Sequence, residues 1–158
     1  MTRLYGWGPT NQRLVEAVPC GHWMTTTFLG GLRSTGLVAP LVIDGAVNGE
    51  LFRAWVQQQL VRELRPGDIV VMDNLSSHKV AGVREAIERV GATLVYLPPY
   101  SPDLNPIEMV FSKIKNEIRK RAPRTKPECD VLCGECLDWF DERECRNDIR
   151  HAGYGPQE

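Results

Sequence analysis

Residues 68–74 read DIVVMDN, a short apolar run with polar residues at both ends. Such a run is typical of a strand buried on both faces, as in a parallel sheet. A second run, ATLVYL at 92–97, follows a segment with helical apolar spacing that Ser77 can cap and Gly91 can end. Strand, helix and strand at this length form a βαβ unit. The sequence therefore predicts an α/β fold around a parallel strand pair.

The segment before this unit predicts a hairpin and a helix. Residues 24–32 and 36–45 are β-prone, and Pro40 in the second of them favours an edge strand or a bulge. Asn48 can cap a helix that runs to about Leu64. These elements place a mixed sheet and at least one covering helix upstream of the βαβ unit.

The segment YSPDLNPIE at 100–108 predicts the start of another helix, which runs from about Pro106 to Arg121. Asn105 can be its N-cap, and Glu108 then takes the third helical position, which gives the asparagine version of a capping box. That interpretation explains Glu108 without any chemistry. The alternative is that its carboxylate belongs to a reactive site.

The chain as a whole has 158 residues, of which 42% are hydrophobic and 25% charged, as in a globular domain. No apolar stretch approaches the roughly 20 residues that span a bilayer, and the first residues do not resemble a signal peptide. We therefore expect a cytoplasmic protein with no membrane partner.

The charges are segregated along the chain. Residues 109–126 carry seven basic side chains against Glu117, a net charge of +6, and residues 127–158 carry three basic and nine acidic side chains, a net charge of −6. The basic block can contact a polyanion such as nucleic acid. It can equally be a solvated helix face that pairs with the acidic tail. Charge alone leaves both interpretations open.

Two carboxylates are expected at the same edge of the sheet. Asp73 follows the first strand of the βαβ unit, and the loop after the second strand leads to Glu108. Ligands of open α/β sheets bind at the carboxyl ends of the strands. Paired carboxylates there suit hard cations such as Mg²⁺, which support phosphoryl transfer. The alternative for Asp73 is a turn residue that caps the following helix.

The cysteines near the carboxyl terminus allow a metal site as well. Cys133 and Cys136 have the spacing of zinc ligands, and Cys145 or His151 can complete a tetrahedron. Only one such close pair exists, so the same residues together with Cys129 also fit buried or incidental thiols.

Two long stretches strongly resemble the DDE-superfamily transposases of the mariner and bacterial insertion-sequence type. They are VVMDNLSSHK at 70–79 and LVYLPPYSPDLNPIEMVFSKIKNEIRKR at 94–121. The family's second catalytic aspartate ends a strand in a DNxxxH context, and its third carboxylate is the glutamate of SPDLNPIE. RLYGWGP at 3–9 and ECRNDIRHAGY at 144–154 extend the resemblance over nearly the whole chain.

This resemblance implies a ribonuclease-H-like fold with a mixed sheet flanked by helices. It implies that Asp73 and Glu108 are catalytic carboxylates that bind Mg²⁺ or Mn²⁺. It further implies DNA transposition, with cleavage and transfer of DNA strands between transposon ends and a target. The candidates for residues that surround the metal site are Asn74, His78 and Asn105. The candidates for DNA contacts are Lys113, Lys115, Arg119, Lys120 and Arg121.

The sequence departs from the family at its beginning. The family's first catalytic aspartate lies on a strand upstream of LYGWGP, and Asp44 lies in a turn where it cannot replace that residue. We therefore expect the fold to lack its first strand, with a partial catalytic domain at 1–122 and a helical extension at 123–158. Such a truncated fragment is expected to be inactive in strand transfer, and poorly soluble or marginally folded because strand edges stay unpaired.

Two alternatives to a transposase fragment follow from the same residues. One is a non-catalytic nucleic-acid-binding remnant that binds DNA through the helix at 109–126 or pairs with a full-length transposase subunit. The other is a small adaptor stabilised by zinc at the cysteine-rich tail. For the chain in general, a homo-oligomer or a full-length transposase subunit is a candidate protein partner besides DNA.

Overall fold

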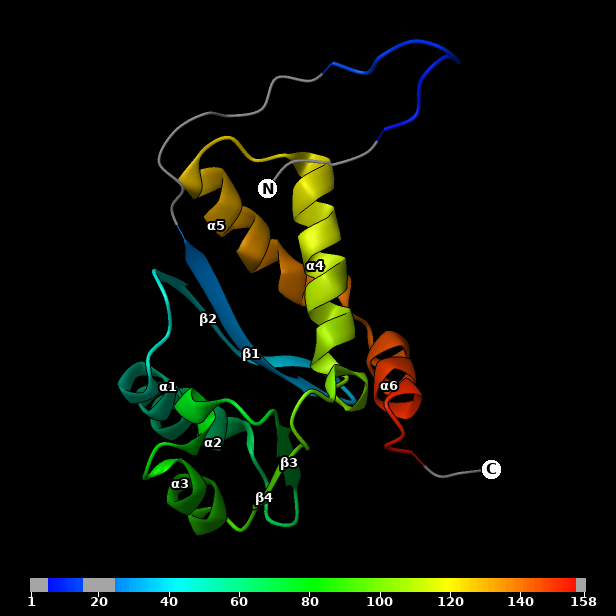
Figure 1. Ribbon diagram of the computed structural model, residues 1–158. Helices are drawn as coiled ribbons and strands as arrows, with labels where there is room; N and C mark the ends of the chain where they lie inside the picture. Colours follow the sequence, from blue (N-terminus) through cyan, green and yellow to red (C-terminus); the bar gives the residue numbers. More distant parts are fainter. Residues whose placement is uncertain (1–5, 16–24, 156–158) are drawn as a thin grey trace.

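The structure is a computed structural model, and it describes residues 6–15 and 25–155 (Figure 1). Two separate two-stranded sheets are surrounded by helices and short helical turns. The strands are β1 (Thr26–Arg33), β2 (Gly36–Asp44), β3 (Ile69–Met72) and β4 (Thr93–Tyr96). The α-helices are α1 (Gly49–Trp55), α2 (Val61–Glu63), α3 (Val83–Arg89), α4 (Ile107–Arg121), α5 (Lys126–Glu135) and α6 (Glu142–His151). In the described ranges, no helix has both the length and the apolar character to cross a membrane.

The predicted hairpin is present as the antiparallel pair β1–β2. Met24, where its first strand was expected to begin, lies outside the described residues. Leu29 pairs with Leu41, but Gly31 pairs with Val38, so the register shifts at the position of Pro40. This irregularity confirms the bulge that the proline predicts, because proline cannot donate a ladder hydrogen bond.

The predicted βαβ unit is also present, with β3 parallel to β4 and Met72 opposite Tyr96. The expectation that these strands are buried on both faces is wrong in part. Met72 and Leu94 are buried, but Ile69 is 69% exposed and Val95 is 43% exposed. The reason is that, within residues 6–15 and 25–155, β3 pairs with β4 alone, and this small sheet leaves part of the strand surface uncovered.

The helix between these strands begins later than predicted. Residues Ser76–Lys79 form a single 3₁₀ turn without a side-chain cap, so the expectation that Ser77 caps the helix is wrong. The helix α3 instead begins after Gly82, whose left-handed φ of 93° suits glycine. The carboxylate of Glu85 accepts a hydrogen bond from the Gly82 N–H (2.8 Å), which caps α3 from within its own first turn.

Two hydrophobic cores organise the molecule. The first core lies among α1, α3, β3 and β4, and its buried members are Ala39, Phe52, Trp55, Val56, Leu60, Met72, Val83, Ala86, Ile87, Ala92 and Leu94. A π-helical turn, Val56–Leu60, joins α1 to α2, so that the three segments follow one another without a break. The second core lies among α4, α5 and α6, and its buried members are Val110, Ile114, Ile118, Cys133, Cys136, Phe140 and Cys145.

The β1–β2 hairpin contributes to both cores, and Figure 1 shows it passing between the two groups of helices. Leu29 and Leu41 pack on the first core, whereas their neighbours Phe28 and Val42 pack on the second. Successive side chains of a strand point to opposite faces, so the same hairpin packs on the first core with one face and on the second core with the other. The Trp55 Nε1–H also donates to the bulged Ala39 carbonyl (2.8 Å), which fixes α1 to the hairpin.

The cysteines near the carboxyl terminus are mostly packing residues. Cys133, Cys136 and Cys145 are buried in the second core, and burial raises the pKa of Cys133 to about 12 and that of Cys136 to about 11. In the part of the chain that the structure describes, no group of three or more cysteine, histidine or acidic side chains is placed to hold a metal ion. The buried-thiol interpretation therefore describes these three residues.

Candidate active site

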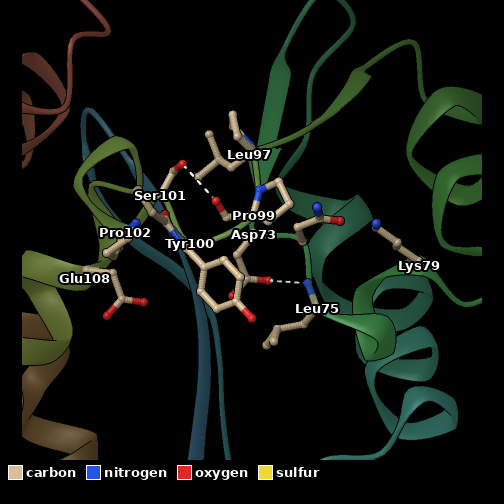
Figure 2. Close-up of a pocket in the computed structure, with 12 residues that line it drawn as sticks. Asp73, Leu75, Lys79, Leu97, Pro99, Tyr100, Ser101, Pro102 and Glu108 are labelled. Atoms are coloured by element: carbon tan, nitrogen blue, oxygen red, sulfur yellow. Dashed lines mark hydrogen bonds between the residues drawn. The ribbon is translucent and has the colours of Figure 1, made fainter.

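The ends of β3 and β4 lie beside each other because the two strands are parallel, and the chain leaves both at the same sheet edge. The Leu97 N–H donates to the Met72 carbonyl (2.8 Å), which holds the two exits together. A pocket of about 490 Å³ opens between these exits and the start of α4 (Figure 2). It is lined by residues 73–75 and 79 after β3, by residues 97–102 after β4, and by Asn105 and Glu108. Asp73 and Glu108, which sequence analysis paired, are thus on one pocket.

Asp73 is held at the end of β3 by its immediate neighbours. Its Oδ1 accepts a hydrogen bond from the Leu75 N–H (3.3 Å), which shapes the turn after the strand. The His78 Nδ1 lies 2.5 Å from the same oxygen, without the alignment of a hydrogen bond. About 37% of the Asp73 side chain is exposed, and the residue lines the pocket, so its carboxylate is accessible to a ligand.

His78 is fixed more firmly than a surface histidine. Its ring stacks on Phe52 of α1, with ring centroids 4.1 Å apart and an interplanar angle of 25°. Its carbonyl accepts a hydrogen bond from the Tyr96 hydroxyl (2.8 Å). Its side chain is only 19% exposed. The first core therefore determines where the imidazole stands beside Asp73.

Asn74 contributes an unused acceptor next to Asp73. Its side-chain Oδ1 is buried and has no hydrogen-bond partner among the residues that the structure describes, although Asn74 lines the pocket. A buried polar atom without a partner carries a desolvation cost unless a ligand or an ordered water compensates for it. This oxygen is therefore an observation in favour of a bound species in the pocket.

Glu108 does not have the capping role that the sequence allowed. The helix α4 begins at Ile107 with Pro106 in the cap position, and it has no side-chain cap hydrogen bond, so the predicted Asn105–Glu108 capping box is wrong. Asn105 has an extended backbone conformation outside the helix, and only its carbonyl engages the helix, by accepting from the Glu108 N–H (3.1 Å). The Glu108 carboxylate instead faces the pocket from the first turn of α4, where the helix dipole favours a negative charge.

The oxygen atoms of the residues that line this pocket are of the chemical type that divalent cations bind. Asp73 and Glu108 supply carboxylates and Asn74 supplies an amide oxygen, and hard cations such as Mg²⁺ bind such ligands. Because the described residues contain no group of three acidic, histidine or cysteine side chains placed for a metal, water or phosphate oxygens would have to complete the coordination.

The basic block of α4 is partly neutralised within the molecule. Lys113 donates to Glu144 (2.6 and 2.7 Å) and to the Trp139 carbonyl (2.7 Å), and Arg121 pairs with Glu135. These pairs are the ones that the acidic-tail interpretation anticipated. Lys120 pairs with Glu117 of the same helix. In the described ranges, Lys115 and Arg119 have no acidic partner, so of the five candidates they are the ones free for a polyanion.

The lining residues that the sequence analysis did not name as candidates include Lys79 and Tyr100. The signal for Lys79 was its place in the loop of Asp73, six residues after the carboxylate. The signal for Tyr100 was its position in the sequence. It is an aromatic residue that stands between two prolines and Ser101-Pro102, in a stretch that offers it no place in the core.

Comparison with known proteins identifies the family and the fold. The model of the DDE superfamily endonuclease family matches residues 1–129. No curated protein matches the sequence. The chain is similar to the crystal structure of the Mos1 strand transfer complex, with 18% identity and a TM-score of 0.74 over 96% of this chain. It is also similar to the Mos1 mariner paired end complex with Mn, with 17% identity and a TM-score of 0.72 over 96% of this chain.

A third similar structure is that of the Mos1 transposase catalytic domain and Raltegravir with Mg, with 18% identity and a TM-score of 0.63. That match covers 82% of this chain and 72% of the other. The chain spans about half the length of the protein chains matched in these two complexes, 47% and 48%. At these identities the structures establish the fold, and the ribonuclease-H-like class expected from the sequence is confirmed.

Proposed function

This chain belongs to the DDE superfamily endonuclease family, and from that premise we propose that its pocket binds divalent cations and acts on DNA phosphodiester bonds in transposition. The observation that carries the proposal is the convergence of Asp73 and Glu108 on one pocket beside the unpaired Asn74 oxygen. The two carboxylates are far apart in the sequence and belong to different packed units. No local folding requirement of either one explains why they face the same space.

Each residue of the pocket has a distinct role in this proposal. Asp73 and Glu108 bind the cations, Mg²⁺ or Mn²⁺, and Asn74 adds a neutral oxygen. His78 positions the Asp73 carboxylate, since its own ring is fixed by Phe52. Divalent cations held there would activate a water molecule or a 3′-hydroxyl for attack on phosphorus and neutralise charge on the phosphate.

The DNA would approach along the side of the molecule where α4 begins. Lys79 lines the pocket, and Lys115 and Arg119 lie further along α4 without acidic partners in the described ranges. Their charge would bind the DNA backbone independently of sequence and with a strong dependence on salt. Transposon ends and a target are the DNA partners we propose, and the helices after residue 122 form an extension to the catalytic domain at 1–122.

Metal binding gives the first test of the proposal. We expect Mn²⁺ titration, followed by electron paramagnetic resonance, to show binding that Asp73→Asn and Glu108→Gln each weaken by about tenfold or more. Asp103→Asn is the matched control, because Asp103 is an exposed carboxylate on the same segment but does not line the pocket. Equal binding by all four proteins would contradict the proposed site.

DNA binding and cleavage give the second test. We expect labelled duplex DNA to bind with an affinity that falls steeply with salt and that Lys115→Ala and Arg119→Ala reduce. Nicking of supercoiled DNA that requires Mg²⁺ and is abolished by Asp73→Asn would establish catalysis. The absence of both metal-dependent DNA binding and nicking would refute the function.

One observation favours a second candidate function, non-catalytic DNA binding. The described residues place two acidic side chains, rather than three, on the pocket. Salt-sensitive DNA binding that persists without any Mg²⁺- or Mn²⁺-dependent nicking would support this second function over the first.

A further inference from the structure

Tyr100 is an aromatic side chain without a structural partner, at the mouth of the pocket. It is fully exposed, although it follows directly on the chain segment that leaves the sheet at Leu97. Its hydroxyl makes no hydrogen bond to the described residues. In the view of Figure 2, its ring is drawn over the carboxylate of Asp73, with Glu108 to the left, and all three residues line the pocket. An aromatic residue usually buries a large apolar area in the protein, and this ring buries none.

The backbone holds Tyr100 in this position at a conformational cost. Its φ is 57°, in the left-handed region that bulky residues rarely adopt. Pro99 precedes it and Pro102 opens the next turn, where Leu104 N–H and Asn105 N–H donate to the carbonyls of Ser101 (3.2 Å) and Pro102 (2.9 Å). These hydrogen bonds and the flanking prolines restrict the backbone on both sides of Tyr100. Strain that is retained in this way clusters at ligand-binding sites.

The chemistry of the pocket indicates which part of a ligand the ring meets. Two carboxylates repel a phosphate unless cations lie between them, so the phosphate of a bound nucleotide is confined to the inner, metal-binding part. The nucleobase is neutral and has an apolar face, and an exposed aromatic ring binds such a face by stacking. The tyrosine ring lines the same pocket as the two carboxylates, so a nucleobase attached to a phosphate held there can reach the ring.

We propose that Tyr100 stacks on an unpaired nucleobase of the DNA strand whose phosphate lies at Asp73 and Glu108. This inference rests on the proposed function and extends it, because it assigns a preference for DNA whose bases are unstacked beside the reacting phosphate. Every base has a stacking face, so the contact is independent of sequence. The strained loop keeps the ring in place before DNA arrives.

The test compares a duplex that carries a three-nucleotide single-stranded overhang with a blunt duplex of the same sequence. Binding is measured by fluorescence anisotropy with Ca²⁺ as the divalent cation. We expect Tyr100→Ala and Tyr100→Leu to weaken binding of the overhang duplex by about tenfold and Tyr100→Phe to preserve it, since stacking needs an aromatic face. We expect none of the three to change binding of the blunt duplex. Trp7→Ala is the control, because Trp7 is equally exposed but lies outside the pocket.

Two further measurements separate stacking from a structural role. A 2-aminopurine base in the overhang should be quenched by the chain and by Tyr100→Phe, but not by Tyr100→Leu. Tyr100→Gly should raise the denaturant midpoint of unfolding, because glycine adopts the left-handed conformation freely, and should weaken overhang binding at the same time. Unfolding at a lower midpoint in Tyr100→Gly would show that the ring supports the fold, and would overturn the inference.

Failure of this inference is distinguishable from failure of the proposed function. If the unmodified chain binds metal and DNA but all Tyr100 variants bind the overhang duplex equally well, the stacking contact is wrong and the pocket assignment stands. If Tyr100→Ala changes self-association in sedimentation but not DNA affinity, the ring belongs to a protein interface and the inference is overturned. If the unmodified chain binds neither metal nor DNA, both fail together.

Discussion

The first and second cores hold the two carboxylates by different means. The first core is filled by aliphatic and aromatic side chains, and β3 brings Asp73 out of it. The second core includes three cysteines and is bounded by ion pairs of Lys113 and Arg121, and α4 brings Glu108 out of it. The hairpin packs on both cores through alternate side chains. The pocket therefore lies between the two packed units, and its geometry depends on both.

The largest expected effect concerns the aliphatic packing of the first core. Ile87 has no exposed surface, and Ile87→Ala should lower the free energy of unfolding by about 3 kcal/mol because a cavity replaces the lost contacts. Ile69→Ala is the matched control in the same unit, since Ile69 is 69% exposed, and should change it by less than about 0.5 kcal/mol. Urea denaturation followed by circular dichroism measures both. A similar loss for the two variants would contradict the boundary of this core.

A smaller effect is expected where a charged residue takes part in the second core. Lys113 donates to Glu144 and Trp139, and its ammonium lies 4.5 Å from the centroid of the Phe140 ring. Lys113→Met should cost about 1–2 kcal/mol of unfolding free energy, because the Trp139 carbonyl and the carboxylate lose a charged donor.

Lys115→Met separates that structural role from a role in DNA binding. Lys115 lies on the same helix, is exposed, and has no acidic partner in the described ranges. Its replacement should leave the urea midpoint nearly unchanged and weaken DNA binding, whereas Lys113→Met should do the reverse. If Lys113→Met weakened DNA binding at unchanged stability, its assignment to the second core would be wrong.

These two lysines also show what sequence reasoning could reach. Net charge identified the basic block and the acidic tail, but it could not decide which cation pairs with which carboxylate. Partner choice depends on how α5 and α6 pack against α4, which no local pattern determines. The parallel strand pair and α4 were predictable because apolar period and chain breakers such as Pro106 act locally.

The site was predictable to a similar extent. The convergence of Asp73 and Glu108 on one pocket was predictable because strand order alone brings the ends of parallel strands together. The caps at Ser77 and Asn105 were wrong, because α3 begins only after Gly82 and α4 begins after Pro106. Tyr100 was missed because a tyrosine carries no signal for a left-handed backbone.

A third prediction concerns the connection between the hairpin and the βαβ unit. Arg33 at the end of β1 forms a two-fold hydrogen-bonded ion pair with Asp68, which precedes β3 (2.7 and 3.1 Å). The Arg33 guanidinium beside Asp68 holds the pKa of that carboxyl below its ordinary value, aided by the Arg65 N–H. Arg33→Met should therefore cost about 1 kcal/mol at pH 7.

The contribution of this ion pair to the free energy of unfolding should change with pH in a definite direction. A carboxyl whose pKa is lowered by folding stabilises the protein above its unfolded pKa of about 4, and the stabilisation is lost as pH falls through the folded value. The gap in unfolding free energy between the unmodified chain and Arg33→Met should therefore be constant from about pH 5 to 7 and close in more acidic solution. A gap that widened on acidification would exclude the ion pair as its cause.

The smallest effect is expected for the thiols of the second core near neutral pH. Burial raises the pKa of Cys136 to about 11 and that of Cys133 to about 12, so both remain protonated in the folded chain at pH 8. A thiol pKa raised by folding stabilises the protein below the unfolded value of about 8.5, and this is lost as pH rises toward the folded values. Stability should therefore be flat between about pH 6 and 7.5 and decline in more alkaline solution.

Iodoacetamide labelling read by mass spectrometry tests the same thiols directly, because the thiolate is the reactive form. Cys136 and Cys133 should label slowly in the folded chain at pH 8 and quickly in urea. Rapid labelling of folded Cys136 would mean that the second core opens locally while the first remains closed. In that case α4, and Glu108 with it, would move independently of Asp73, and the pocket would form only when a ligand joins the two units.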